Sequence, residues 1–297
     1  MRQKCALILI FTSYIEAKDN FLEIGIRNRS FKSKIETNDK HKNITSYNSV
    51  TNSTPKTDII AKFDLGFEYN SIRYYARIAE LDSTIEGGVK IKKGNIQYDI
   101  GLLKDLQKEA YINPYLLNGN RGETKINAYG AYINYNYEFE KYVYLDLIYK
   151  IKKDKYLSDA QKGTTLDRES ITHLLKGIYN YKIAFLGVEY QKGDAKGEAS
   201  SFDRYGVELE LKMPINNLFF LARVGYYDKK FDATNPYFNR VQKNKERLLL
   251  LYARYSKILN LPDTYIGASY MYNRCDSNLD LFDEKIKSYT ITFGYQF

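Results

Sequence analysis

Ionisable side chains alternate with apolar ones along much of this chain. Between residues 204 and 212, charged or small residues at even positions alternate with Tyr, Val and Leu at odd positions. Successive side chains of a β-strand point to opposite faces, so such a strand has one charged and one apolar face. A dry core does not tolerate many ionisable groups, whereas a water-filled cavity keeps them solvated. The chemistry expected of the charged face is the attraction and repulsion of hydrophilic solutes along a wetted wall.

Basic residues slightly outnumber acidic ones on this expected inner face, which would favour anions weakly through the summed field. Most of the charges are expected to pair across neighbouring strands. Arg73 and Arg77 flank Tyr75 in one inward row, so we expect their potentials to add within a Debye length. The residues predicted to line the cavity are Arg27, Lys62, Arg73, Arg77, Lys90, Asp99, Asp146, Arg204, Glu208, Glu210, Arg223 and Arg254.

Residues typical of catalytic or metal sites are scarce. The chain has two histidines, His41 in a polar stretch and His173 near Asp167 in the sequence. A catalytic triad is defined by spatial geometry, and no hydrolase-like motif surrounds either histidine. No Cys and His cluster suggests a metal, and no glycine-rich loop opens a helix to hold a nucleotide. We therefore expect no enzymatic activity, no cofactor and no metal.

Composition indicates a membrane barrel. The 297 residues include 30 Tyr, 5 Pro and no Trp, and the mean hydropathy is −0.51. No run approaches the ~18 apolar residues of a membrane helix. A barrel explains the low hydropathy, because only alternate residues of each strand face lipid. The net charge of +9 is spread along the chain, which argues against the clustered basic patch of a nucleic-acid binder.

The first residues have the form of a secretory signal: a basic head at 1–4, then a short apolar stretch at 5–11. We predict a signal peptide at 1–17 and a barrel at 18–297. Removal of the signal takes Cys5 with it and leaves Cys275 alone, so disulfides are not expected.

The remaining chain divides into about fourteen alternating segments joined in turn by tight turns and longer loops, as in membrane barrels. A soluble all-β sandwich is the alternative, but it would not need short turns on one side only. The fold class predicted is all-β, a transmembrane antiparallel up-and-down β-barrel. Its strands are expected at 21–29, 59–69, 72–80, 84–92, 96–103, 126–137, 142–152, 171–180, 183–191, 204–212, 218–229, 248–256, 265–274 and 288–297.

The last segment, 288–297, alternates strictly and ends on an aromatic residue, although chain ends normally fray in water. It resembles the C-terminal signal of bacterial outer-membrane β-barrels, with Gly294, Tyr295 and the terminal Phe297 as the assembly residues. In that family the last strand pairs with the first. The strand–turn–strand form of 208–227 and the final hairpin from 265 are similar to the monomeric outer-membrane protein G porins. The chain departs from that type by lacking Trp, with Tyr in its place at the membrane interfaces.

The resemblance implies an outer-membrane porin of a Gram-negative bacterium. Such a protein is a water-filled diffusion channel for ions and small hydrophilic solutes, including oligosaccharides, and here it is expected to prefer anions weakly. The implied partners are outer-membrane lipid and lipopolysaccharide, the barrel assembly machinery and small solutes. We expect a monomer that binds no nucleic acid. A barrel enzyme of the phospholipase or protease type and a sealed structural or adhesive barrel are the alternatives.

Overall fold

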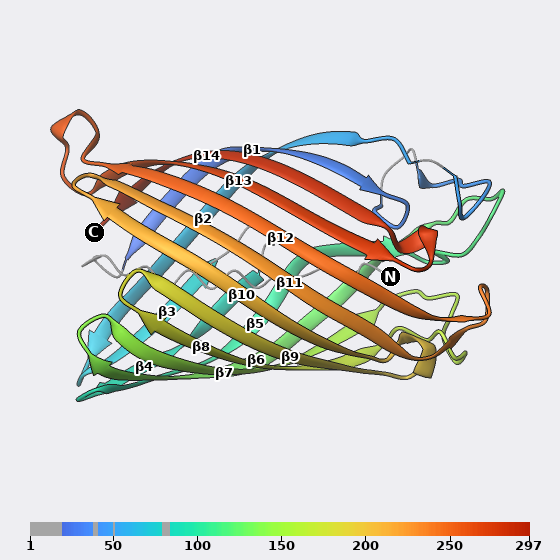
Figure 1. Ribbon diagram of the computed structural model, residues 1–297, viewed down its shortest axis with the longest axis horizontal. Helices are drawn as coiled ribbons and strands as arrows, with labels where there is room; N and C mark the ends of the chain where they lie inside the picture. Colours follow the sequence, from blue (N-terminus) through green and yellow to red (C-terminus); the bar gives the residue numbers. More distant parts are fainter. Residues whose placement is uncertain (1–19, 38–40, 50, 79–83) are drawn as a thin grey trace.

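The chain forms one closed barrel of antiparallel strands (Figure 1). The computed structural model describes residues 20–37, 41–49, 51–78 and 84–297, so the predicted signal peptide at 1–17 lies outside the described residues. The predicted fold class is confirmed. The strands are β1 (Phe21–Ser33), β2 (Thr54–Tyr69), β3 (Ile72–Ile78), β4 (Thr84–Lys93), β5 (Ile96–Tyr111), β6 (Glu123–Glu140), β7 (Val143–Tyr156), β8 (Ser170–Tyr181), β9 (Ala184–Ala195), β10 (Phe202–Ile215), β11 (Leu218–Asn235), β12 (Arg240–Ser256), β13 (Thr264–Ser277) and β14 (Glu284–Gln296).

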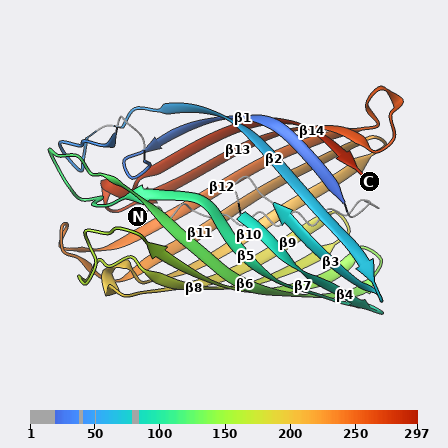
Figure 2. The same cartoon turned by 180° about the vertical axis from the view of Figure 1, so that it is seen from behind.

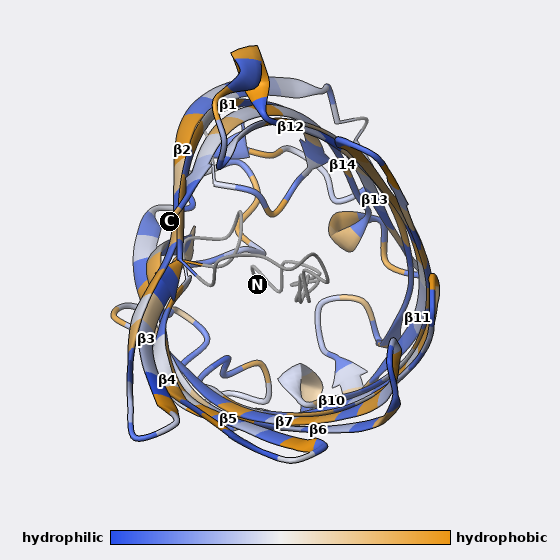
Figure 3. Cartoon of the chain, turned by 90° about the vertical axis from the view of Figure 1, so that its left-hand side faces the viewer, coloured by the Kyte–Doolittle hydropathy of each residue, from blue (hydrophilic) through white to orange (hydrophobic). Residues whose placement is uncertain are grey.

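Alternation along each strand produces the two faces of the barrel wall. In β10, Leu209 is 47% exposed on the outer face, whereas its neighbours Glu208 and Glu210 are buried on the inner face. The same alternation colours the strands in bands when the barrel is viewed along its axis (Figure 3). The result is an outer belt of Leu, Ile, Val, Tyr and Phe, suited to hydrocarbon, around an inner wall rich in charge. Among the described residues, no helix has the length and apolar character needed to cross a bilayer.

The two rims of the barrel differ. Five of the strand connections at one rim are two-residue turns, such as Asn70-Ser71 and Gly94-Asn95, where positive φ angles close the hairpin. The sixth connection at this rim is longer and contains the short helix η3 (Ile258–Asn260). The other rim carries most of the long loops, as the two side views show (Figures 1 and 2). Membrane barrels place short turns toward the periplasm and long loops outside the cell.

The barrel closes through pairing of β14 with β1, as predicted for the last strand. Beyond the last ladder pair, the Phe297 N–H donates to the Asn20 carbonyl at 3.0 Å, and the Tyr295 and Phe297 rings stack on the outer face. Gly294 faces inward beneath the ring of Tyr265, where a Cβ would lie 2.0 Å from the ring carbon Cζ. Glycine at this position therefore lets Tyr265 lie flat against the seam.

Several strands are longer than the sequence pattern predicted, and the longest extensions are at the long-loop rim. The expected loop at 104–124 is strand up to Tyr111 and again from Glu123, and β12 begins at Arg240 within a predicted loop. The outward residues of these extensions, such as Lys243 and Lys245, are polar and exposed. They pair like other strand residues but project beyond the apolar belt, so the apolar and polar alternation that reveals a lipid-facing strand is absent there.

Candidate functional site

The inner wall of the barrel carries the residues predicted to line a cavity. All twelve lie on the inward positions of their strands. Nine are buried and three, Lys62, Arg77 and Lys90, are half-buried. The nine buried ones are Arg27, Arg73, Asp99, Asp146, Arg204, Glu208, Glu210, Arg223 and Arg254. Their placement does not by itself test a role in permeation, which stays a prediction.

One ion-pair network extends over β2 to β7. Arg73 Nη2 lies 2.7 Å from Asp64 Oδ1, and Arg77 Nη2 lies 2.7 Å from Glu86 Oε2. Lys150 from β7 contacts the same Glu86 at 3.4 Å. Because Arg73 and Arg77 each face a carboxylate, their potentials are largely cancelled locally. The expectation that these two charges simply add does not hold in this arrangement.

A second network extends over β8 to β12. Glu208 accepts hydrogen bonds from the Lys176 ammonium at 2.8 Å and from the Tyr227 hydroxyl. Arg204 donates to Glu246 at 2.9 Å and to Glu189, and its guanidinium lies 3.9 Å from the centre of the Tyr227 ring. Most charges in this network therefore have more than one partner, so the wall spreads its electrostatic compensation over several strands.

Lys90 and Arg254 are the exceptions on the basic side. Within the part of the chain that the structure describes, neither has a carboxylate within 4.0 Å. Lys90 lies 5.4 Å from the ring centre of Tyr75, and Arg254 lies 5.1 Å from that of Tyr265. Unlike the paired charges of the two networks, these two cations contact aromatic rings and no described carboxylate.

The long loops form a feature that the sequence pattern did not indicate. We call the described loop segments at this rim the loop cap: 34–37, 41–49, 112–122, 157–169, 196–201, 236–239 and 278–283. The view along the axis shows loop segments inside the outline of the strands (Figure 3). Apolar residues from distant parts of the sequence pack there into one core, together with Phe202 and Phe231 at strand ends. The loop residues of this core are Ile35, Ile44, Tyr115, Leu166, Ala199, Leu279, Leu281 and Phe282.

Arg121 holds three parts of the loop cap together without any carboxylate among its hydrogen-bond partners. Its guanidinium donates to the carbonyls of Lys34 at 2.6 Å, Pro114 at 2.7 Å and His41 at 3.2 Å. The side chain is fully buried and stacks on the Tyr111 ring at 4.1 Å. Burial lowers the pKa of Arg121 to about 10, which still leaves the group charged at neutral pH. Arg121 therefore joins these loop segments through one side chain, whose hydrogen bonds all go to backbone carbonyls.

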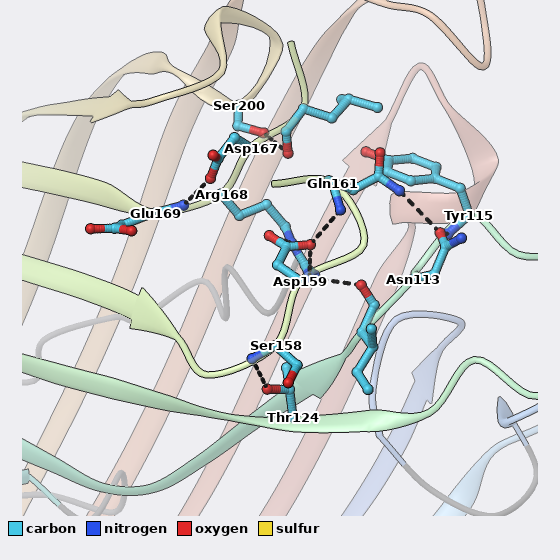
Figure 4. Close-up of polar contacts among 12 residues, drawn as sticks. Asn113, Tyr115, Thr124, Ser158, Asp159, Gln161, Asp167, Arg168, Glu169 and Ser200 are labelled. Carbon is cyan, nitrogen blue, oxygen red and sulfur yellow. Dashed lines mark hydrogen bonds and ion pairs between the residues drawn. The ribbon is translucent and has the colours of Figure 1, made fainter. Parts of the chain in front are cut away.

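A second arginine ties neighbouring loops more conventionally. Arg168 donates to both oxygens of Asp159, at 2.6 and 2.9 Å, and to the Ile112 carbonyl at 3.1 Å (Figure 4). Ser200 donates to the Leu166 carbonyl at 3.0 Å in the same region. The loops from β5, β7 and β9 are thus joined by polar contacts as well as by the apolar core.

Two copies of the sequence Asn-Pro-Tyr, at 113–115 and 235–237, meet in the loop cap. In each copy the Asn side-chain oxygen accepts a hydrogen bond from the Tyr N–H two residues on, at 3.1 and 3.0 Å. The rings of Tyr115 and Tyr237 stack with centres 4.4 Å apart and planes 7° apart, and Asn235 donates to the Tyr115 hydroxyl at 3.1 Å. The repeat was visible in the sequence, but only the fold shows that its copies touch.

The two histidines lie in different parts of the barrel, His173 in β8 and His41 in a loop segment. The ring of His173 is on the outer face, where Nδ1 lies 2.8 Å from the Tyr149 hydroxyl. His41 is buried in the loop cap. In the described part of the chain, no group of three His, Cys, Asp or Glu side chains is placed to hold a metal ion.

The comparison with protein families covers nearly the whole chain. The model of a family described as a protein of unknown function (DUF2860) matches residues 19–296. The chain belongs to this family. The family description names no function, so membership of DUF2860 does not indicate an activity. No curated protein matches this chain.

Solved structures share the barrel architecture of this DUF2860 protein at low sequence identity. A FadL homologue of Pseudomonas aeruginosa matches with a TM-score of 0.52 and 10% identity, over 96% of this chain and 91% of that one. OprD of P. aeruginosa matches at 0.44 and 12%, over 94% and 97% of the two chains. OccAB4 of Acinetobacter baumannii matches at 0.45 and 12%, over 95% and 99%. At 10% identity, the likeness to the FadL homologue supports the barrel fold alone.

Proposed function

We propose that this protein is an outer-membrane channel through which ions and small hydrophilic solutes diffuse. The observation that carries the proposal is the contrast between the faces of one wall. In β10 the outward Leu209 is 47% exposed, while inward Glu208 and Glu210 belong to a charged network. Charges of this number need water, and the inside of a membrane barrel is where water can reach them.

A weak preference for anions is the second part of the proposal. Paired charges contribute little to the electrostatic field inside the barrel. The anion preference is therefore expected to come mainly from Lys90 and Arg254, which have no carboxylate neighbour among the described residues. The small excess of basic over acidic residues on the whole inner wall adds to it. The preference should decline as salt is raised, because screening shortens the reach of each charge. Passage of oligosaccharides and the outer-membrane protein G type of pore are finer predictions of the same proposal.

Conductance in planar bilayers tests the channel, and the reversal potential in a salt gradient tests its selectivity. We expect stable single-channel conductance steps and a reversal potential displaced toward the equilibrium potential of the anion. Lys90→Gln with Arg254→Gln should move the potential toward cations more than one paired residue such as Lys176→Gln does. A cation-selective wild-type pore would contradict the anion preference.

A barrel that inserts but passes no current would contradict the channel itself. Hydrolysis of lipid or peptide by such a sealed barrel would favour the enzyme alternative, and its absence would favour a structural or adhesive role. We propose no enzymatic activity, because His173, the described histidine that lies in a strand, is on the outer face of β8. The proposal also includes a monomeric state and insertion by the barrel assembly machinery through the 288–297 strand.

A further inference from the structure

Four basic side chains form a row on the outer face of the barrel, one on each of four neighbouring strands. Arg247 of β12 lies opposite Arg274 of β13, Arg274 opposite Lys285 of β14, and Lys285 opposite Lys32 of β1. These strands run side by side (Figure 1). The side chains of Arg247 and Arg274 are 56% and 47% exposed. We call these four residues the basic row.

The basic row lies at the loop-side border of the apolar belt. One step toward the short turns, Tyr272 lies opposite Leu249 and Lys287. The Lys285 ammonium lies over the Tyr272 ring, 5.5 Å from its centre. One step further, Tyr270 and Tyr289 pack at 4.9 Å. Tyrosines mark the level of lipid headgroups in membrane proteins, so the row is at the height of the outer-leaflet headgroups.

Like charges placed directly opposite one another on adjacent strands destabilise a sheet. Among the described residues, Asp276 is the one carboxylate that contacts the row, at 2.7 Å from Arg274 and 3.7 Å from Arg247. Lys287 lies two residues along β14 from Lys285, on the same face, and adds further positive charge, whereas Lys245 lies opposite Asp228 and Asp276. The row therefore keeps a surplus of positive charge that the other described residues do not balance.

Other parts of the same rim do balance their outward charges. Lys192 of β9 lies opposite Asp203 of β10, and Asp203 lies opposite Lys230 of β11. On β7, Lys153 contacts Glu169 at 3.8 Å. Lys230 is also opposite Lys243 of β12, but Asp203 lies opposite Lys230 on its other side. Arg274 and Lys285 differ because each lies opposite a basic residue on both neighbouring strands, and a general basic rim does not account for this.

We propose that the basic row binds the phosphate groups of a phosphorylated glycolipid in the outer leaflet. Strands about 4.8 Å apart give a row spanning roughly 14 Å, enough to engage two phosphates of one headgroup. The guanidinium groups of Arg247 and Arg274 suit bidentate contacts with phosphate oxygens, and the two lysines supply point charges. Acyl chains of the same lipid would then lie along the apolar belt below Tyr270 and Tyr289. The inference rests on the proposed membrane location and is independent of conduction.

The test is lipid retention by the full-length protein folded in a zwitterionic detergent, counted by native mass spectrometry. The probes are bisphosphorylated lipid A, monophosphoryl lipid A and phosphatidylglycerol. We expect the wild type to retain the bisphosphorylated form at least tenfold better than phosphatidylglycerol. The Lys32→Gln, Arg247→Gln, Arg274→Gln and Lys285→Gln quadruple variant should lose about tenfold. A wild type that does not discriminate between the probes would overturn the proposal.

The matched control removes the same charge from the opposite wall: Lys104→Gln, Lys125→Gln, Lys153→Gln and Lys155→Gln on β5 to β7. It should change retention less than twofold, and an equal loss in both quadruple variants would show a general charge effect and overturn the proposal.

Asp276→Asn gives a second test should the first quadruple variant not fold. It removes the carboxylate that competes for Arg247 and Arg274, so retention should rise about threefold. Unchanged or weaker retention would contradict the proposal, and conductance of the same variants keeps it separate from channel function.

Discussion

The barrel wall and the loop cap solve the problem of buried charge in different ways. Arg204 in the wall contacts Glu246 and Glu189, and Lys176 also lies 3.8 Å from that Glu189. Arg121 in the loop cap donates only to backbone carbonyls from three segments. The wall thus distributes compensation over many partners, whereas the loop cap concentrates several contacts on one side chain. Loss of one residue should therefore be tolerated in the wall and should open the cap.

The largest loss of stability is expected for a change on the outer face of the barrel wall, because that face is expected to contact lipid. Leu209→Arg places a charge on the belt and should cost about 2–4 kcal/mol near the bilayer middle. Unfolding by guanidinium in lipid vesicles measures this cost. Leu209→Met is the control, and it should cost less than about 1.5 kcal/mol. Equal stability of the two variants would show that β10 does not face hydrocarbon at this position.

The next effect should be confined to the loop cap. Arg121→Gln removes charge-assisted hydrogen bonds worth about 1.5–3 kcal/mol each, of which an amide can replace some. We expect the loop cap to become easier to open by about 2–3 kcal/mol, seen as faster hydrogen exchange at 41–49 and 112–122. Exchange in the strands should not change. Arg121→Lys keeps the positive charge but not the several donors of the guanidinium, so the free energy of opening the loop cap should fall by about half as much. Unfolding of the whole barrel in either variant would contradict a role confined to the loop cap.

The paired Asn-Pro-Tyr copies give a smaller effect in the same region. Asn235→Ala removes the bond to the Tyr115 hydroxyl and the turn bond to the Tyr237 N–H. It should ease opening of 236–239 by about 1–2 kcal/mol. Asn235→Asp keeps the acceptor for Tyr237 but lacks the donor for Tyr115, and so should show an intermediate rate of hydrogen exchange. An Asp variant as open as the Ala variant would assign the effect to the contact with Tyr115 alone.

The smallest effect is expected for one charge of the wall. Arg204→Gln leaves Glu189 near Lys176 and exposes Glu246 to lumen water, so the barrel should lose only about 1 kcal/mol, near the value of a solvated ion pair. The guanidinium titration used for Leu209 measures it. A loss as large as that from Leu209→Arg would show that the inner wall is dry, contrary to the account.

Sequence alone predicted the barrel well because lipid imposes the same alternation on every strand it touches. Where a strand extends beyond the lipid, as β12 does before Leu248, this alternation is absent. The sequence pattern therefore did not predict that part of the strand. The inward placement of Arg73 and Glu208 followed from the parity of their strands. Their ion-pair partners did not follow, because these depend on the register between strands and on side-chain reach.

The loop cap was beyond prediction for a different reason. Its core joins Ile44, Leu166 and Leu281, which are far apart in the sequence and belong to no periodic pattern. Arg121 stands among polar residues and resembles any solvated loop charge until the carbonyls of Lys34 and Pro114 are placed around it. The Asn-Pro-Tyr repeat was the one local signal of this region.

The most direct test of the account is access of water to the inner wall during conduction. In a Cys275→Ser background, Thr290→Cys places a thiol on an inward position of β14, and Ile291→Cys places one on the adjacent outward position. A charged, membrane-impermeant thiol reagent is added while single channels are recorded in a planar bilayer. The account predicts a stepwise change in conductance for Thr290→Cys and none for Ile291→Cys. A channel that stays unchanged after proven modification of Thr290→Cys, or no reaction at that position, would contradict the claim that ions pass along this wall.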